Sequence, residues 1–341
     1  MRALYYEQLG GYQRIRAGKF PRPEIGDHDV LVRVRAFSLN HLDVWVMEGK
    51  LPLDIPLPHI FASDASGIVE KAGRDVNHVS PGDEVVVHPG LSCGSCEQCL
   101  SGRDNECRNF SILGVLTPGV SAEYVRVPVA NVLHQPKGLS PEEASAIGIT
   151  YATAWNLLVL RGGIRQGDVV FIHGGSGGAG TALIQVAKLY HATVITSVGD
   201  DWKIEKAKGL GAHHVINYKQ DDFAEGVKRI TKGEFADIAV DHIGADTLQR
   251  TLAIVKRGGR VITFGATSGD EVSVSLRSIF GRNITVHGVY LGPQSAVCTY
   301  LRLFPRHLKP VIDSVFAFND VHKAYEKLLS RQFFGKIVVK I

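Results

Sequence analysis

Residues 169 to 180 read V-V-F-I-H-G-G-S-G-G-A-G, so that four apolar residues run directly into a glycine-rich turn. In this turn Gly175, Gly177 and Gly180 match the spacing G-x-G-x-x-G, and the amphipathic run from Thr181 to Leu189 has the pattern of a helix. In such a strand, turn and helix the first glycine permits the turn, the second admits a pyrophosphate, and the third allows close packing. The helix N-terminus adds unpaired N–H groups that attract an anion.

An ordinary glycine-rich turn is the alternative interpretation, but the strand before the turn and the helix after it favour a dinucleotide site. The predicted cofactor-binding turn contains Gly175, Ser176, Gly177, Gly178, Ala179 and Gly180.

Strands and helices alternate after the turn. The strand patterns are at residues 193–197, 214–217, 238–241, 260–264 and 284–290, and the helix patterns are at 201–210, 223–231 and 246–255. With residues 169–172 this makes six strands, the number in a doubly wound dinucleotide-binding sheet. The sequence therefore predicts a parallel sheet with helices on both faces.

The first 130 residues have a different pattern. Short apolar or alternating runs at 30–37, 67–70, 84–87 and 123–127 are separated by turns, and helices are expected only later, first at 142–160. The tail returns to mixed structure, with a helix at 321–329 and a strand at 336–341. Since 341 residues exceed what a single core usually organises, we expect two domains, one of them mostly β.

Composition excludes several classes of partner. Lys plus Arg is 38 against 34 for Asp plus Glu, a net charge of +4 that is too mild to indicate nucleic acid. No apolar run is long enough to cross a bilayer, and the N-terminus lacks the apolar core of a signal peptide. We expect a cytoplasmic protein without a membrane partner that acts on a small molecule.

Four of the five cysteines lie close together. Cys93, Cys96, Cys99 and Cys107 have the spacing C-x2-C-x2-C-x7-C in a loop rich in glycine and polar residues. Four thiolates can close tetrahedrally on one Zn²⁺ and leave no open position for substrate, so the predicted zinc is structural. An iron–sulfur cluster and unliganded thiols are the alternatives, although the spacing differs from that of the usual ferredoxin runs.

The glycine turn and the cysteine cluster, in this order and separation, make the chain similar to the medium-chain dehydrogenase/reductase superfamily, the fold of zinc alcohol dehydrogenases and quinone reductases. Further matches are G-D-E-V at 82–85, T-A-W at 153–155, G-G-R at 258–260 and G-K-I-V at 335–338. The resemblance implies an α/β protein with a GroES-like, mostly-β catalytic domain at 1–150 and 291–341, which includes a structural-zinc lobe at 91–110. It also implies a six-stranded doubly wound Rossmann domain at 151–290, an active site in the cleft, and a homodimer or homotetramer.

The chain departs from the zinc alcohol dehydrogenases at the catalytic metal. Where those enzymes have a Cys, a His and a further Cys or acid, this sequence has Asn40, Ser63 and Ile149, which offer neither thiolate nor imidazole. We therefore expect no catalytic zinc. His41 and Asp43 remain as candidate catalytic residues beside Asn40, or they only fix the backbone of their loop.

The run S-L-N-H-L-D-V-W at 38–45 is instead similar to the zinc-independent quinone reductases, which have Asn in place of the catalytic Cys. The family's hydroxyl for proton relay is replaced by Leu42, and some quinone reductases have a tyrosine where this chain has Trp45. The proton donor is therefore unassigned.

The second strand of the Rossmann domain bears on the choice of cofactor. In sites that prefer NAD an acidic residue at the end of this strand binds the ribose hydroxyls, but here the strand ends in Val198 and Gly199. Ser197 and Lys203 are expected to accommodate a 2′-phosphate, while Asp200 and Asp201 are expected to cap the next helix. The sequence thus predicts NADPH, with NADH as the alternative.

The resemblance implies further cofactor contacts. Thr153, the backbone at Phe264 and Gly265, and that at Val289 and Tyr290 are expected to face the nicotinamide, and Lys336 to touch its ribose. Each of these residues has a packing role as its alternative.

Without a Lewis-acid zinc, hydrogen bonds from Asn40, His41 or water must stabilise the charge that hydride transfer leaves on the acceptor. A quinone, an α,β-unsaturated carbonyl or an aryl ketone spreads that charge itself. Our hypothesis is an NADPH-dependent reductase of such an acceptor with one structural Zn²⁺ per subunit. The alternatives are an alcohol dehydrogenase or ketone reductase with a rebuilt metal site, and a protein that binds NADPH without turnover.

Overall fold

The computed structural model describes all residues from Met1 to Ile341, and they form two compact units. Unit 1 contains Met1–Thr150 and Pro293–Ile341, and unit 2 contains Tyr151–Gly292. The sequence-based division ended the Rossmann domain at residue 290, whereas unit 2 ends at Gly292. No helix combines the length and the apolar composition that a membrane span needs.

Unit 2 is built on a six-stranded parallel sheet, in which the strands follow the order β13-β12-β11-β14-β15-β16. The strands are β11 (Val169–Ile172), β12 (Thr193–Val198), β13 (His214–Asn217), β14 (Ala236–Asp241), β15 (Val255–Thr263) and β16 (Thr285–Gly288). The order reverses between β11 and β14, which is the doubly wound arrangement. The structure thus confirms the predicted Rossmann fold.

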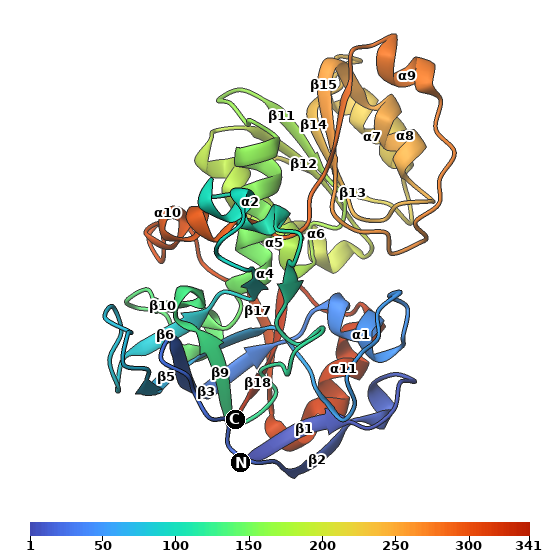
Figure 1. Cartoon of the computed structure of the whole chain (residues 1–341). Coiled ribbons are helices and arrows are strands. Elements are labelled where there is room, and N and C mark those ends of the chain that lie inside the picture. The colour runs from blue at the N-terminus through green and yellow to red at the C-terminus, as the bar shows by residue number, and fades with distance from the viewer. The chain divides into compact units, whose positions relative to one another are not determined.

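Helices cover both faces of this sheet. Figure 1 shows α5 (Gly178–Leu189) and α6 (Ile204–Leu210) on one side, and α7 (Phe223–Ile230) and α8 (Leu248–Ala253) on the other. The short helix α9 (Leu276–Phe280) follows before β16. Buried side chains from strands and helices form the core between the layers, among them Phe171, Ile195, Val227 and Leu252.

The predicted helix at 142–160 is wrong as a single element. It divides into α3 (Pro141–Ala144), α4 (Gly148–Trp155) and a π-helical segment (Asn156–Arg161). The carboxyl group of Asp64 explains the new start, because its Oδ1 accepts the N–H of Ile149 at 2.7 Å in the first turn of α4. A long-range contact that composition does not encode therefore sets this helix boundary.

Unit 1 is mostly β, as predicted. Its main sheet has the order β10-β6-β5-β3-β18-β17, with β9 paired to β3 as well. These strands are β3 (Asp29–Ser38), β5 (Asp64–Ala72), β6 (Glu84–Val87), β9 (Tyr124–Pro128), β10 (Val132–His134), β17 (Ile312–Ala317) and β18 (Lys336–Lys340). The tail joins the N-terminal sheet because β18 runs antiparallel to β3.

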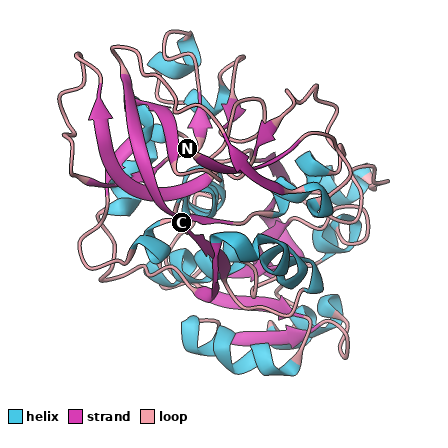
Figure 2. Ribbon diagram, turned by 90° about the horizontal axis from the view of Figure 1, so that it is seen from below, coloured by secondary structure: helices cyan, strands magenta, loops and turns pink.

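The remaining elements of unit 1 surround this sheet. They are β1 (Arg2–Tyr6), β2 (Arg16–Lys19), β4 (His59–Ile60), β7 (Gly90–Leu91), β8 (Ser111–Ile112), and the helices α1 (His41–Met47), α2 (Glu97–Leu100), α10 (Val297–Leu301) and α11 (Val321–Ser330). The expectation that helices appear only after residue 140 is wrong, since α1 follows β3 directly. The two termini lie near each other in Figures 1 and 2.

Candidate functional site

The glycine turn joins β11 to α5, whose N-cap is Gly177. Gly174 and not Gly175 takes the left-handed conformation, with φ of +66°, which corrects the role assigned to the first glycine of the motif. Gly175 serves close packing instead, because a Cβ there would lie 2.2 Å from Thr196 Oγ1 on β12. A Cβ at Gly180 would likewise lie 2.2 Å from Gly174 O, so the third glycine has the predicted packing role.

Gly177 is the open position of the turn. A Cβ there would have no neighbour nearer than Gly174 O at 3.6 Å. The first N–H groups of α5 point out of its N-terminus, where the helix dipole favours an anion. This part of unit 2 therefore has the space and the donors that a pyrophosphate needs, and Ser176, Gly178 and Ala179 complete it at the half-buried surface.

The residues expected around a 2′-phosphate lie at the end of β12. Ser197 is buried, and its Oγ accepts the N–H of Gly174 at 3.2 Å. Lys203 is also buried, with its Nζ 3.1 Å from a carboxylate oxygen of Asp200. Lys219 binds the other oxygen of Asp200 at 2.9 Å.

Asp200 is therefore an ion-pair residue, and its expected side-chain capping hydrogen bond is absent. Hydrogen bonds from Lys219 and Lys203 hold the pKa of Asp200 at about 2. Asp201 also binds side chains, Asn217 at 2.6 Å and Gln220 at 2.9 Å. Asp200 does occupy the predicted N-cap position, but neither aspartate is assigned a side-chain capping hydrogen bond.

The other predicted nicotinamide contacts are spread over unit 2. Phe264 and Gly265 follow β15 directly, and Val289 and Tyr290 follow β16, so both pairs lie at the carboxyl edge of the sheet. Thr153 is buried in α4. Ligands of doubly wound sheets bind at this edge.

In unit 1 the predicted residues gather around a carboxylate that sequence reasoning did not single out. Asp64 is fully buried and accepts hydrogen bonds from Ile149 N at 2.7 Å, Asn40 Nδ2 at 2.9 Å and Lys336 Nζ at 3.2 Å. Lys336 Nζ also donates to Asn40 Oδ1 at 2.6 Å, and Ser38 Oγ lies 3.4 Å from Asp64 Oδ2. We call Ser38, Asn40, Asp64 and Lys336 the Asp64 cluster.

Local sequence allows this cluster to form. A Cβ at position 148 would lie 2.3 Å from Asp64 Oδ1, so only glycine lets the carboxylate reach the start of α4. The register that pairs Val338 with Ser38 brings β18, and with it Lys336, beside the end of β3. The cluster uses two of the three N–H groups of the Lys336 ammonium and one of the two amide N–H groups of Asn40.

His41 and Asp43 have different environments. Burial, together with the positive charge of Arg331, lowers the pKa of His41, so its imidazole is neutral at pH 7. The ring of His41 lies edge-on to that of Trp45, with 5.5 Å between the centroids. It is half-buried at the start of α1 and remains available as a neutral donor or acceptor.

Asp43 lies in the first turn of α1, and its side chain is buried in the core. Its Oδ2 accepts the backbone N–H of Asn40 at 2.8 Å and the hydroxyl of Tyr325 at 3.3 Å. Burial raises the pKa of Asp43 to about 7 against the lowering effect of these contacts and of Lys336. The geometry favours the backbone-fixing role over the catalytic one.

Ser63 is the second of the positions where metal enzymes have a ligand. It is buried, and its Oγ has no hydrogen-bond partner. The preceding residue Ala62 has φ of +66°, a left-handed conformation that is uncommon for a residue with a side chain. Leaving a hydroxyl buried and unpaired costs about 1–3 kcal/mol, so this group is a candidate for contact with a ligand.

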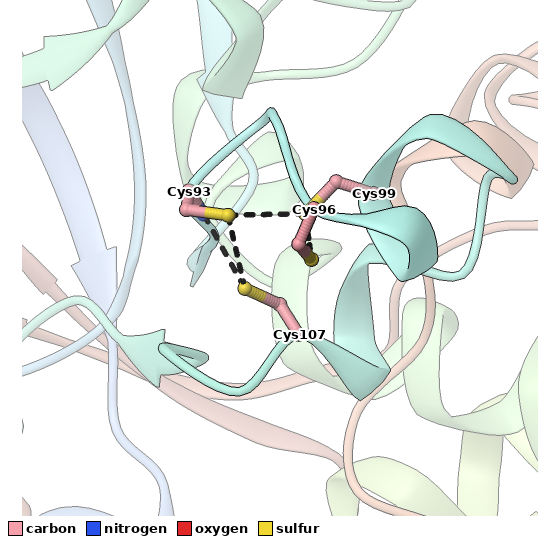
Figure 3. A group of neighbouring side chains, drawn as sticks. All are labelled: Cys93, Cys96, Cys99 and Cys107. Carbon is pink, nitrogen blue, oxygen red and sulfur yellow. Dashed lines mark hydrogen bonds between the residues drawn. The ribbon is translucent and has the colours of Figure 1, made fainter.

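The four cysteines bring their sulfur atoms together, as Figure 3 shows. Cys93 Sγ lies 3.9 Å from Cys99 Sγ and 3.5 Å from Cys107 Sγ, and the sulfur atoms of Cys96 and Cys99 are 3.5 Å apart. Zn–S bonds of about 2.3 Å place tetrahedral ligands about 3.8 Å apart, so the four thiols fit one zinc ion. They are the one group of three or more His, Cys, Asp or Glu side chains with metal-binding geometry.

Hydrogen bonds within unit 1 anchor the lobe at Asp104 and favour the thiolate form of Cys93. Asp104 accepts the N–H of Gln294 with both oxygens, at 2.9 and 3.1 Å. Hydrogen bonds from the backbone at Ser95 and Cys96 lower the pKa of Cys93 to about 6. A zinc ion held here by four thiolates would supply folding energy and no chemistry.

A Rossmann unit, a mostly-β unit and a four-cysteine lobe together define a pyridine-nucleotide oxidoreductase fold of the medium-chain class. Comparisons with known proteins agree. Residues 26–137 match the alcohol dehydrogenase GroES-like domain family, and residues 178–306 match the zinc-binding dehydrogenase family. The chain therefore belongs to the zinc-type alcohol dehydrogenase family of the medium-chain dehydrogenase/reductase superfamily, as its sequence indicated.

Individual relatives span the whole chain. A zinc-type alcohol dehydrogenase-like protein of Schizosaccharomyces pombe is 30% identical over 100% of this chain and 99% of its own. The human quinone oxidoreductase is 25% identical over 96% of this chain and 94% of its own. A crystal structure of an NAD-dependent alcohol dehydrogenase superposes with a TM-score of 0.96 at 40% identity over 100% of both chains.

The first prediction concerns the cysteine lobe. We expect the purified protein to hold about one zinc per chain by elemental mass spectrometry, because four thiolates form one closed site. Cys107→Ser should lose this zinc and lower the melting temperature. Cys298→Ser, which changes the one cysteine outside the lobe, should keep it. Full zinc content in the Cys107 variant would contradict the assignment.

The second prediction follows from Asp43. The pKa of the Asp43 carboxyl is 3.8 in the unfolded chain and about 7 in the folded chain. At a pH between these two values the folded chain therefore holds one more proton than the unfolded chain. Its contribution to stability therefore falls by about 1.4 kcal/mol per pH unit as the pH rises from 4 to 7. We expect Asp43→Asn to lose this slope in urea titrations at pH 4.5, 5.5 and 6.5.

The exposed Asp54→Asn serves as the control and should keep the wild-type slope. Parallel stability curves for the wild type and Asp43→Asn would show that the buried carboxyl is not protonated in the folded state.

Proposed function

We propose that the chain is an NADPH-dependent reductase of a quinone, an enone or an aryl ketone that works without a catalytic zinc. The Asp64 cluster is the observation that carries this proposal. Asn40 Oδ1 already accepts the Lys336 ammonium at 2.6 Å, so a metal cation bound to that oxygen would lie within roughly 5 Å of another positive charge. Ser63 and Ile149 add no strong ligand, which further favours a reaction without a metal.

The chemistry needs a hydride and a proton. When bound, NADPH supplies the hydride to the acceptor's carbon and leaves as NADP⁺. The electron pair of the broken π bond then moves to the acceptor's oxygen, where a proton from water gives the alcohol from a ketone. From an enone or a quinone the same proton gives an enol, which rearranges to the saturated carbonyl or to the hydroquinone. The protein's task is to stabilise the negative oxygen until that proton arrives.

Two groups of unit 1 are suited to this task. The second amide N–H of Asn40 is outside the Asp64 cluster, and the Ser63 hydroxyl has no protein partner. Asn40 is oriented by contacts at both ends of its amide, so its free N–H has a fixed direction. We propose that Asn40 and Ser63 donate hydrogen bonds to the acceptor's oxygen and that neutral His41 is a secondary donor.

The third prediction tests this function. The purified protein should oxidise NADPH in the presence of members of a panel of quinones, enones and aryl ketones. With NADP⁺ it should oxidise simple alcohols poorly. Ser63→Ala should lower kcat about 10- to 100-fold through loss of one donor to the oxyanion, with little change in the Kd for NADPH. Ser63→Thr, which keeps a hydroxyl, should recover part of the activity.

Ser314→Ala is the matched control, because Ser314 Oγ in unit 1 is also buried without a partner, and this variant should keep wild-type kcat. Tight nucleotide binding with no turnover on the panel would instead support a binding protein. About two zinc ions per chain together with alcohol oxidation would support an alcohol dehydrogenase with a rebuilt metal site.

The preference for NADPH is a separate part of the proposal. Val198 ends β12, where sites that prefer NAD carry an acid. Ser197 is the residue before it, and Lys203 ends the short 3-10 helix (Asp201–Lys203) that follows the strand. The Tyr218 hydroxyl lies close to Gly199, 2.5 Å from where a Cβ would be, and adds a donor there. The NAD-dependent structural relative favours NADH as the second candidate.

The fourth prediction compares two lysines that bind the same carboxylate. Lys203→Ala should raise the Kd for NADPH about 10-fold and change that for NADH less than about 2-fold, because a charged hydrogen bond to the 2′-phosphate is lost. Lys219→Ala removes the exposed partner of Asp200 and should change neither affinity by more than about 2-fold. Fluorescence titration with both nucleotides measures this, and equal weakening of both by Lys203→Ala would refute the assignment.

We also propose a cytoplasmic homodimer or homotetramer that acts on a small molecule, without nucleic acid or membrane partners. Strand β16 is an edge of the parallel sheet, and Leu276 and Phe280 of α9, in the segment before it, are both 69% exposed. An open strand edge near apolar side chains favours association with a second copy.

A further inference from the structure

His242 lies at a point of unit 2 to which no role is yet assigned. It follows the last residue of β14, just as the glycine turn follows β11. These two strands are neighbours and flank the place where the strand order reverses. Ligands of open parallel sheets bind in the crevice at this reversal.

The His242 ring faces the glycine turn. Its Cε1 and Nε2 atoms lie 2.7 and 3.1 Å from the place that a Cβ on Gly174 would occupy. On the other side the ring is tilted against Phe264, with 5.4 Å between the centroids. The side chain is half-buried. A polar ring thus lies between the turn after β11 and the segment after β15.

The backbone at His242 is held firmly. Asp241 Oδ1 accepts the N–H groups of Ile243 at 2.9 Å and Gly244 at 3.0 Å, and Thr267 N donates to His242 O at 3.1 Å. Asp241 itself is fully buried and accepts hydroxyl hydrogen bonds from Thr247 and Thr251. His242 is therefore presented by a rigid support, as a ligand-binding residue requires.

The strand order of unit 2 indicates which part of a bound dinucleotide would lie near the His242 ring. The end of β12 receives the adenosine ribose, and the N-terminus of α5 after β11 receives the pyrophosphate. β14 lies on the opposite side of β11 from β12, so the half of the cofactor beyond the pyrophosphate passes over its end.

We propose that the His242 imidazole donates a hydrogen bond to an oxygen of the nicotinamide-side phosphate of the bound dinucleotide. The inference rests on the proposed use of a pyridine dinucleotide and is independent of whether that is NADPH or NADH. His242 is then a cofactor-binding residue outside the glycine motif, supplied by the fourth strand of the sheet.

The fifth prediction uses fragments of the cofactor in calorimetric titrations of the full-length protein. His242→Ala should weaken NADPH and 2′-phospho-ADP-ribose about 10-fold, since a hydrogen bond to a charged oxygen is lost. It should change the affinity for 2′,5′-ADP, which ends at the first phosphate, by less than about 2-fold. If NADH is the tighter nucleotide, ADP-ribose and AMP replace the two fragments.

Two further variants separate hydrogen bonding from packing. His242→Phe keeps a ring without a donor and should bind as weakly as His242→Ala, whereas His242→Gln keeps an N–H donor and should bind within about 3-fold of the wild type. His214→Ala, at an exposed histidine on β13, is the control and should bind as the wild type does.

Wild-type affinity in His242→Ala or in His242→Phe would overturn the inference, and so would equal weakening of all three ligands, which indicates damage to the turn. A wild type that binds no dinucleotide would overturn both this inference and the proposed function. Normal binding of NADPH with no turnover on any acceptor would overturn the proposed function alone.

Discussion

The buried contact between Asp64 and Lys336 is the constraint on which unit 1 depends. Lys336 and Asp64 come from strands 272 residues apart in the sequence, and their side chains are 5% and 0% exposed. Two charges so far from water are tolerated only when every partner is present, and removal of one partner from such a pair typically costs about 3–5 kcal/mol. The pair therefore ties the C-terminal strand, the loop at Asn40 and the start of α4 to one point.

The two buried carboxyl groups beside Asn40, those of Asp64 and Asp43, have different hydrogen-bond partners. Asp64 has an ammonium, an amide and a helix N-terminus as partners, all of which stabilise a negative charge. Asp43 has one backbone N–H and a tyrosine hydroxyl, and burial raises its pKa to about 7. Asn40 connects the two, because its backbone binds Asp43 while its side chain binds Asp64. The contact with Asp43 fixes the backbone of Asn40, and the contacts with Asp64 and Lys336 fix the orientation of its side-chain amide.

Features encoded by neighbouring residues could be predicted from the sequence, whereas those that depend on distant contacts could not. The glycine turn, the strand pattern of unit 2 and the cysteine spacing are local, and the fold they indicate is the one observed. Asp64 was not singled out as a site residue, because its importance comes from Lys336 and Ile149, far away in the chain. The motif spacing also pointed to Gly175 as the turn residue, while only backbone angles identify Gly174.

The same distinction explains how a four-cysteine cluster can occur in a chain whose proposed reaction site lacks zinc ligands. All four cysteines lie on one loop from Cys93 to Cys107, and their geometry depends on that loop and its anchor at Asp104. The positions where metal enzymes have catalytic ligands are instead spread from Asn40 to Ile149, so the polar groups there are set by the packing of the whole unit. Asn40 is oriented by a cation and an anion at once, and the proposed reaction assigns to its hydrogen bonding the stabilising task that a metal performs in the zinc enzymes.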